Sequence, residues 1–187
     1  MFKRFSKLLL ISCLVLGACS NNGGVTESSG QGAPVTNIDT DFLISIASSQ
    51  QSIRNYVSNK TLIAYSPSHG LQIEYYSPSG DLFLWYPGNT RIVEGHWKTQ
   101  SDNEICYLYS SSSRNPVTGQ MGGTWECTYA AAVFIFDYER LPGNPFNLEP
   151  GPVGFVLTRR PFQTASTVAG RLGIDSSFPG SLKTARN

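Results

Sequence analysis

Short runs of β-forming residues, separated by turn residues, constrain the fold of this chain more than any other feature of its sequence. Separators such as Pro78-Ser79-Gly80 and Pro87-Gly88-Asn89 contain residues that preset a turn or tolerate a positive φ. Connections this short force consecutive strands to pair antiparallel. The sequence therefore predicts a mainly β fold, an antiparallel meander that forms a small barrel or sandwich. The expected strands are residues 61–65, 71–77, 82–86, 91–99, 104–109, 124–129, 132–138 and 154–158.

The alternation of side chains along these strands assigns their faces. Glu94 and His96 share the polar side of the strand at 91–99, whereas Trp97 lies on its apolar side. The strand at 82–86 is different, because apolar residues occupy both of its sides. A small barrel, or a sandwich with a helix packed on one side, covers such a strand on both faces.

The segments that flank the strands complete the expected domain. Residues 41–57 have the apolar spacing of one amphipathic helix, which gives the β domain a short amino-terminal helix. Residues 141–152, rich in proline, glycine and asparagine, are typical of a long surface loop. Residues 180–187 are expected to form a disordered tail. Together these predictions define a single β domain over residues 38–179.

The amino terminus has the order of a bacterial signal peptide. Three basic residues precede an apolar run at residues 8–16. This run is shorter than the roughly 20 apolar residues that a membrane-spanning helix needs. It ends at Leu16-Gly17-Ala18-Cys19, which resembles the lipobox of bacterial lipoproteins. An ordinary secretory signal with a cysteine near its cleavage site is the alternative interpretation.

The resemblance to lipoproteins implies that residues 1–18 are removed and that Cys19 begins the mature chain. In that class the cysteine carries a diacylglyceryl group and an acylated amino group, with palmitate among the acyl chains, so the implied partner of Cys19 is a membrane. Ser20 follows the cysteine, which is similar to lipoproteins sent to the outer membrane, next to the periplasm. Residues 19–37 are then the lipidated cysteine and a flexible tether rich in small polar residues. The implied location is the bacterial cell envelope.

Two cysteines remain for the folded domain. Cys13 leaves with the signal peptide and Cys19 carries the lipid, which leaves Cys106 and Cys127 in a chain expected to meet an oxidising compartment. An even remainder in neighbouring expected strands predicts one disulfide. The alternative is a metal or redox pair, which lacks the Cys-x-x-Cys spacing and has only the two histidines of the chain to assist it.

Three motifs lie in or beside the expected strands: Tyr75-Tyr76-Ser77-Pro78-Ser79-Gly80, Gly95-His96-Trp97 and Glu104-Ile105-Cys106-Tyr107. Together they resemble a group of small uncharacterised exported proteins of alphaproteobacteria, over residues 61–157. This resemblance implies no activity. The same residues are typical fold signals, since Gly80 suits a positive φ, Gly95 a bulge or close contact, and Trp97 a core position.

Candidate catalytic residues are few. A net charge of +1 gives no support to a nucleic-acid partner. His96 lies on the same side of a strand as Glu94, an arrangement that suits either an acid–base pair or a surface charge pair. His69 occupies a turn and is expected to be solvated. The sequence contains no phosphate-binding loop, His-Glu-x-x-His motif or calcium loop, so we expect no enzymatic activity, no cofactor and no metal site.

Aromatic residues are the remaining candidates for a binding site. Seven of them suit either the core or the wall of a ligand cavity, namely Tyr75, Trp85, Trp97, Tyr107, Tyr109, Trp125 and Tyr129. Of these, Trp85, Trp97, Trp125 and Tyr107 are the predicted ligand-lining residues. The sequence thus predicts a lipid-anchored envelope lipoprotein that acts as a non-enzymatic binding or envelope-structure module, with an envelope protein as its partner. The alternative is a lipocalin-like carrier of a small apolar ligand.

Overall fold

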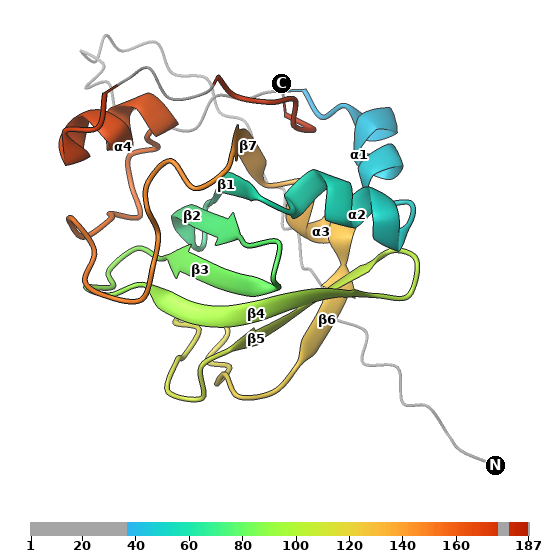
Figure 1. Cartoon of the computed structure of the whole chain (residues 1–187), viewed down its shortest axis with the longest axis horizontal. Coiled ribbons are helices and arrows are strands. Elements are labelled where there is room, and N and C mark those ends of the chain that lie inside the picture. The colour runs from blue at the N-terminus through green and yellow to red at the C-terminus, as the bar shows by residue number, and fades with distance from the viewer. Residues whose placement is uncertain (1–36, 176–179, 187) are drawn as a thin grey trace, which may run out of the picture.

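The computed structural model describes residues 37–175 and 180–186. Seven strands form one antiparallel sheet that curls into a half-barrel (Figure 1). The strands are β1 (Lys60–Ser66), β2 (Gly70–Tyr76), β3 (Asp81–Trp85), β4 (Val93–Gln100), β5 (Glu104–Tyr109), β6 (Glu126–Tyr129) and β7 (Asp137–Pro142). Their spatial order is β6-β5-β4-β3-β2-β1-β7. The mainly β, antiparallel fold expected from the sequence is confirmed, with seven strands in place of the eight that were expected.

The turn between β2 and β3 shows how the separators produce the meander. The N–H of Gly80 donates to the carbonyl of Ser77 at 3.0 Å, and the carbonyl of Gly80 accepts from the N–H of Trp97 at 2.8 Å. Gly80 has a φ of +95°, a conformation that costs a residue with a Cβ far more than glycine. The turn brings Tyr76 opposite Leu82 in antiparallel register.

A short helix, α3 (Ala130–Phe134), connects the two edge strands of the sheet. It runs from the end of β6 to the start of β7, and β7 then pairs with β1 on the other edge. The prediction of a strand at residues 132–138 is therefore wrong, because α3 ends at Phe134 and β7 begins only at Asp137. Three consecutive alanines favour helix in this segment, and Phe134 is fully buried in the core.

Two helices, α1 (Thr40–Ile46) and α2 (Gln50–Val57), replace the single helix expected at residues 41–57. The helix is interrupted between them because Ser49 caps α2. The side chain of Ser49 accepts a hydrogen bond from the N–H of Ser52 at 3.1 Å. Both helices pack on the concave face of the sheet (Figure 1). The buried residues of this concave core are Leu43, Ile46, Ala47, Ile53, Tyr56, Val57, Leu62, Tyr76, Leu82, Trp97, Ile105, Ala130, Phe134 and Ala185.

A second core lies on the convex face of β1, β2 and β3, under the segment that follows β7 and under α4 (Ala165–Leu172). Within β3, Leu82 belongs to the concave core and Trp85 to the convex core. The expectation that this strand is covered on both faces is confirmed. The buried residues of the convex core are Ile63, Tyr65, Leu71, Ile73, Trp85, Ile92, Leu141, Phe146, Leu148, Leu157, Ala165, Val168 and Ala169.

The segment after β7 differs from its prediction. Residues 141–152 are not a simple surface loop, since Phe146 and Leu148 are buried in the convex core. Residues 154–158 form no strand, and α4 lies where no helix was expected. The many turn residues of this segment indicate a loop, but its scattered apolar side chains fold back over the sheet without pairing with it.

The disulfide predicted between Cys106 and Cys127 is present, with an S–S distance of 2.01 Å. The two cysteines lie directly opposite each other on β5 and β6. This bond therefore closes the loop that connects the two strands, residues 110–125, at its base.

Residues 180–186 are not a disordered tail, contrary to the prediction. The N–H of Leu182 donates to the carbonyl of Arg140 at 2.7 Å along the edge of β7, and Ala185 is fully buried. The predicted signal peptide, Cys19 and nearly all of the predicted tether lie outside the described residues. In the part of the chain that the structure describes, no helix is long and apolar enough to cross a membrane.

Candidate functional site

A cluster of polar side chains lies on the concave face of the half-barrel. Glu74 shares its side of β2 with Tyr76, which belongs to the concave core. Tyr107 and Tyr109 share their side of β5 with Ile105 of the same core. The pleat of two separate strands therefore directs one carboxylate and three phenols into the space on the concave side of the half-barrel, which is called the lumen.

Hydrogen bonds join these four side chains. The hydroxyl of Tyr109 donates to Oε1 of Glu74 at 2.6 Å, and the hydroxyl of Tyr76 donates to Oε2 at 2.6 Å. The hydroxyls of Tyr76 and Tyr107 are 3.2 Å apart. Both carboxylate oxygens of Glu74 are thus held by phenols, which fixes the position of the carboxyl group.

The environment of Glu74 disfavours its charge. Burial raises the pKa of the Glu74 carboxyl above its ordinary value, and the hydrogen bonds from Tyr109 and Tyr76 act in the opposite direction. Among the described residues, no lysine, arginine or histidine forms an ion pair with Glu74. Burial also raises the pKa values of Tyr76, Tyr107 and Tyr109, so these phenols remain hydrogen-bond donors.

A second buried carboxylate, Asp137, lies on the same face. Its Oδ2 accepts a hydrogen bond from the hydroxyl of Tyr56 at 3.1 Å. Burial raises the pKa of Asp137 well above its ordinary value, and the nearby charge of Glu74 adds to this effect, while Arg140 opposes it. The guanidinium of Arg140 lies 4.5 Å from the ring centre of Tyr56. The lumen thus contains two carboxyl groups whose pKa values burial raises.

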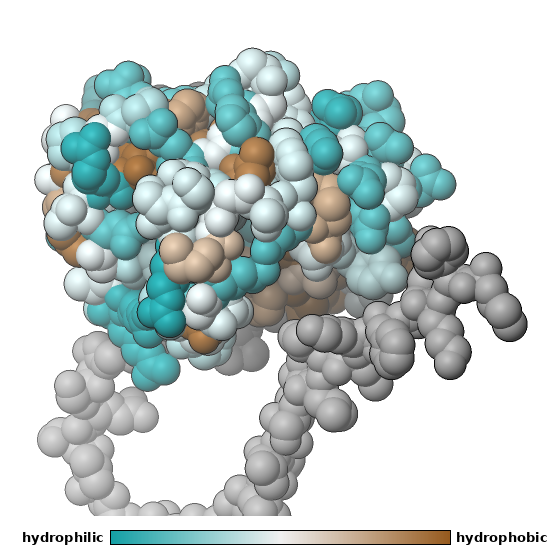
Figure 2. All heavy atoms as spheres, turned by 90° about the horizontal axis from the view of Figure 1, so that it is seen from below, coloured by the Kyte–Doolittle hydropathy of each residue, from teal (hydrophilic) through white to brown (hydrophobic). Residues whose placement is uncertain are grey.

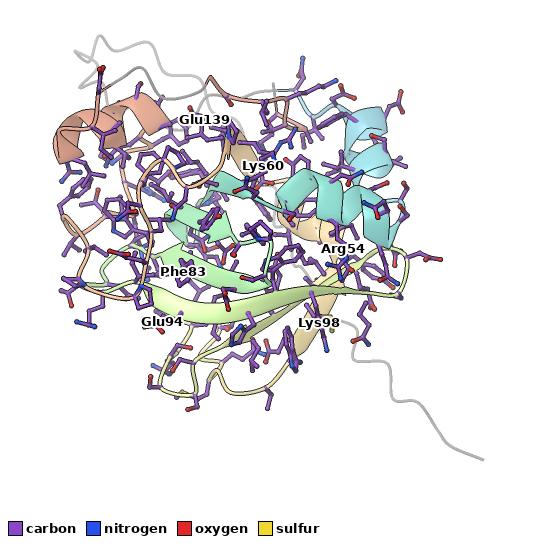
Figure 3. All side chains as sticks on the ribbon, viewed as in Figure 1. Arg54, Lys60, Phe83, Glu94, Lys98 and Glu139 are labelled. Atoms are coloured by element: carbon purple, nitrogen blue, oxygen red, sulfur yellow. A yellow bond between two sulfur atoms is a disulfide. The ribbon has the colours of Figure 1, made fainter. Side chains whose placement is uncertain are left out.

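A cavity of about 650 Å³ opens beside this cluster and is called the larger cavity. Gln72 and Leu84 line it from the sheet, and Tyr109 links it to the hydrogen-bonded cluster. Its charged residues include Arg91, Arg114 and Glu94, of which Glu94 is labelled toward one end of β4 in Figure 3. The other lining residues are His69, Tyr86, Gly88, Asn89, Thr90, Ile92, Val93, Ser110, Ser112, Ser113, Asn115 and Pro116.

A second cavity of about 220 Å³, the smaller cavity, adjoins the larger one. The two share Tyr109, Ser113 and Asn115 as lining residues. The loop between β5 and β6 thus contributes to the walls of both cavities, and the disulfide closes this loop at its base. The other residues that line the smaller cavity are Tyr107, Gln120, Met121, Gly122, Thr124, Glu126, Cys127 and Thr128.

The two histidines occupy different environments. His69 is partly buried rather than fully solvated, and its Nδ1 lies 2.9 Å from the hydroxyl of Tyr86. Burial and the nearby Arg159 lower the pKa of His69. His96 is exposed and pairs across the strands with Asp81 at 3.2 Å, so the surface pair is formed with Asp81 and not with Glu94.

The predicted ligand-lining aromatic residues separate into three groups. Trp85 and Trp97 belong to the convex and concave cores and line neither cavity. Trp125 is exposed, with the ammonium of Lys98 lying 4.2 Å from its ring centre. Tyr107 lines the smaller cavity.

Sequence reasoning did not identify Glu74 as part of this site. The pattern that could have identified Glu74 is an acid on the same side of an expected strand as an aromatic core residue, Tyr76. Tyr109 is one of the seven aromatic candidates, but it is not among the four predicted ligand-lining residues. Its role becomes visible only when β5 is placed across the lumen from β2, which no local pattern shows.

The described residues contain no group of three or more histidine, cysteine, aspartate or glutamate side chains that could hold a metal ion. The residues that line the two cavities offer hydrogen bonds, aromatic faces and carboxylates to a ligand. No protein-family model, curated protein or solved structure matches this chain.

Proposed function

We propose that this protein is a lipid-anchored lipoprotein of the bacterial cell envelope whose β domain binds a small ligand without catalysing a reaction. The larger cavity carries this proposal. Its volume of about 650 Å³ falls in the range of roughly 300–1,000 Å³ that is typical of small-molecule sites. Small β-barrels commonly hold one small ligand among their side chains.

The lining of the larger cavity favours a ligand with polar groups over the purely apolar ligand of a lipocalin-like carrier. Leu84 and Val93 supply apolar surface, whereas Gln72, Asn115 and several hydroxyls supply hydrogen-bonding groups. A purely apolar ligand would leave these polar groups without partners, which costs binding free energy.

The histidines support binding rather than catalysis. His69 is bonded to a tyrosine hydroxyl, and His96 to an exposed aspartate. Within the described residues, neither imidazole is hydrogen-bonded to a serine or cysteine side chain that could act as a nucleophile. We therefore assign the site no catalytic role.

The surface gives less support to an envelope-structure role. Exposed large hydrophobic residues, such as Ile44, Trp125 and Val156, come from separate parts of the chain. Figure 2 shows one face of the molecule on which hydrophobic side chains occur in small separate groups among hydrophilic ones. A stable protein partner usually needs a larger continuous patch.

Ligand binding can be tested by titrating the full chain, in detergent, with a panel of small anionic, neutral and cationic compounds, followed by protein NMR. We expect at least one compound to perturb residues around Tyr109 and Ser113. Replacing Ser113 with tryptophan fills space shared by both cavities and lowers the affinity at least about tenfold. Thr118→Trp, in the same loop but lining neither cavity, is the matched control. A panel without a single binder contradicts the proposal.

The anchor can be tested separately by labelling cells with a palmitate analogue. We expect the wild-type chain to take up the label and Cys19→Ala to lose it, because only the cysteine thiol can form the required thioether. Cys13→Ala removes a cysteine that precedes the expected cleavage site and is the matched control. Equal labelling of the Cys19→Ala and wild-type chains would show that the protein is not lipidated at this residue.

A further inference from the structure

The smaller cavity combines aromatic walls with negative charge. The rings of Tyr107 and Tyr109 line it and lie nearly parallel, with an interplanar angle of 4° and centroids 6.1 Å apart. Glu126 is its charged lining residue, and no lysine, arginine or histidine of the described chain lines it. Aromatic faces and carboxylates both attract cations.

Glu74 adds a second carboxyl group next to these rings. The hydroxyl of Tyr109 donates to Glu74 at 2.6 Å, and the hydroxyl of Tyr76, bonded to the same carboxyl, lies 3.2 Å from that of Tyr107. The hydrogen bonds hold the tyrosines in place before a ligand arrives.

The rim of the larger cavity has the opposite character. Arg91 and Arg114 both line it, and neither forms an ion pair with another described residue. Two guanidinium groups repel a cation and attract an anion. The positive end of a ligand that spans both cavities is therefore directed into the smaller one.

We propose that the smaller cavity binds the ammonium group of an organic cation, with Tyr107 and Tyr109 as its aromatic walls and Glu126 as its counter-charge. This inference rests on the proposed ligand-binding function and names the ligand class of that site. A volume of about 220 Å³ and apolar walls that include Met121 suit an alkylated ammonium group. A metal ion such as Ca²⁺ takes six to eight oxygen ligands, roughly, and fits these walls poorly.

The test compares choline with two probes, its uncharged carbon analogue dimethylbutanol and the anion butyrate. Each is titrated into the full chain in detergent, and binding is followed by calorimetry and by protein NMR. We expect choline to bind at least about tenfold more tightly than dimethylbutanol, because choline and dimethylbutanol share a shape and differ in charge. The NMR shifts caused by choline should centre on Tyr107 and Glu126.

Two variants assign the effect to the site. Glu126→Gln keeps the shape of the side chain and removes its charge, and Tyr107→Leu removes an aromatic wall. Each should weaken choline binding by about five- to tenfold. Glu94→Gln removes a carboxylate that lines the larger cavity and not the smaller one, and it should leave choline affinity within about twofold of wild type.

The possible results separate this inference from the proposed function. Equal affinities for choline and dimethylbutanol, or unchanged choline affinity in both Glu126→Gln and Tyr107→Leu, overturn the cation site. A third result is that butyrate binds, Ser113→Trp abolishes this binding, and choline does not bind. This result overturns the cation site and leaves the proposed ligand-binding function in place. Binding of none of the three probes overturns the cation site, and failure of the wider panel then removes the proposed function as well.

Discussion

At the scale of single residues, the site depends on how Glu74 is held. A carboxyl group in the lumen without an ion-pair partner among the described residues is costly unless hydrogen bonds satisfy it. Tyr109 and Tyr76 supply these bonds, one to each oxygen. The two tyrosines therefore have a structural role in addition to lining the lumen.

The replacement Tyr109→Phe tests this role. It keeps the ring and removes the hydroxyl that donates to Glu74, so we expect the free energy of unfolding to fall by about 1–3 kcal/mol. Tyr75→Phe is the matched control, because the Tyr75 hydroxyl bonds Asn59 at the surface at 3.2 Å. This control should cost less than about 0.5 kcal/mol in urea unfolding. Equal losses of unfolding free energy in the two variants would mean that the hydrogen bond from Tyr109 to Glu74 stabilises the fold no more than a surface hydrogen bond does.

Residues whose roles depend on local pattern could be predicted, and those that depend on packing could not. The alternation in β4 correctly assigned Trp97 to the core and His96 to the surface. The partner of His96, Asp81, lies on β3, so only the register between the two strands identifies it. Glu74 escaped prediction for the same reason, since its hydrogen-bonding partner Tyr109 lies on a strand that is not its neighbour.

At the scale of elements, the loop between β5 and β6 depends on the disulfide at its base. Cys106 and Cys127 are separated by 21 residues, and a loop of this length contributes about 3 kcal/mol in the chain-entropy model. The double variant Cys106→Ser, Cys127→Ser should lose about this much stability in urea unfolding. It should also bind cavity ligands more weakly, because the loop lines both cavities. A reductant should destabilise the wild type and leave the stability of the double variant unchanged. A wild type that a reductant does not destabilise would contradict the stabilising role of the disulfide.

Gly122 gives a second test of the same loop. A Cβ at this position would lie 2.8 Å from the carbonyl oxygen of Tyr109 and closer still to that of Ser110, so the backbone must shift. Gly122→Ala should therefore lower the unfolding free energy by about 1–3 kcal/mol and weaken ligand binding. Gly170→Ala is the contrasting control, since open space surrounds this glycine in α4 and alanine favours helix by about 0.5–1 kcal/mol. Similar stability changes of the same sign in both variants would contradict this account.

Elements with strong turn signals were predicted well, and elements defined by packing were not. Separators made of turn residues place six of the seven strands near their observed positions. The alanine-rich segment before β7 contains β-forming residues as well, and its helix is stabilised by burial of Phe134 against the concave core. The segment covering the convex core has too little regular pattern to show which face of the sheet it contacts.

At the scale of the whole molecule, the sheet separates two cores with different chemistry. The convex core is apolar, whereas the concave core ends at a cluster of tyrosines and carboxyl groups. The sequence predicts antiparallel pairing because its turns are short, but it leaves open whether the meander forms a small barrel or a sandwich. It did not show that β7 returns to pair with β1, since this contact depends on the path of α3 around the open side.

The buried carboxyl groups make the stability of the whole domain depend on pH. Burial raises the pKa values of Glu74 and Asp137 in the folded state above those of the unfolded chain. The folded protein therefore takes up protons at a higher pH than the unfolded chain does. Each group then contributes stability as the pH falls through its folded-state pKa, and loses this contribution as the pH rises again.

We expect the thermal unfolding midpoint to rise as the pH is lowered from about 8 to about 6.5. Below about pH 6.5 the lowered pKa of His69 acts in the opposite direction, because the unfolded chain then binds the extra proton. Asp137→Asn keeps an oxygen that can accept from Tyr56 and removes the titration, so its midpoint should change less with pH. Asp81→Asn is the matched control, since it removes an exposed carboxylate and should keep the wild-type slope above pH 6.5. If Asp137→Asn and wild type show the same slope, Asp137 is already charged across this range and the environment of the lumen is more polar than its burial implies.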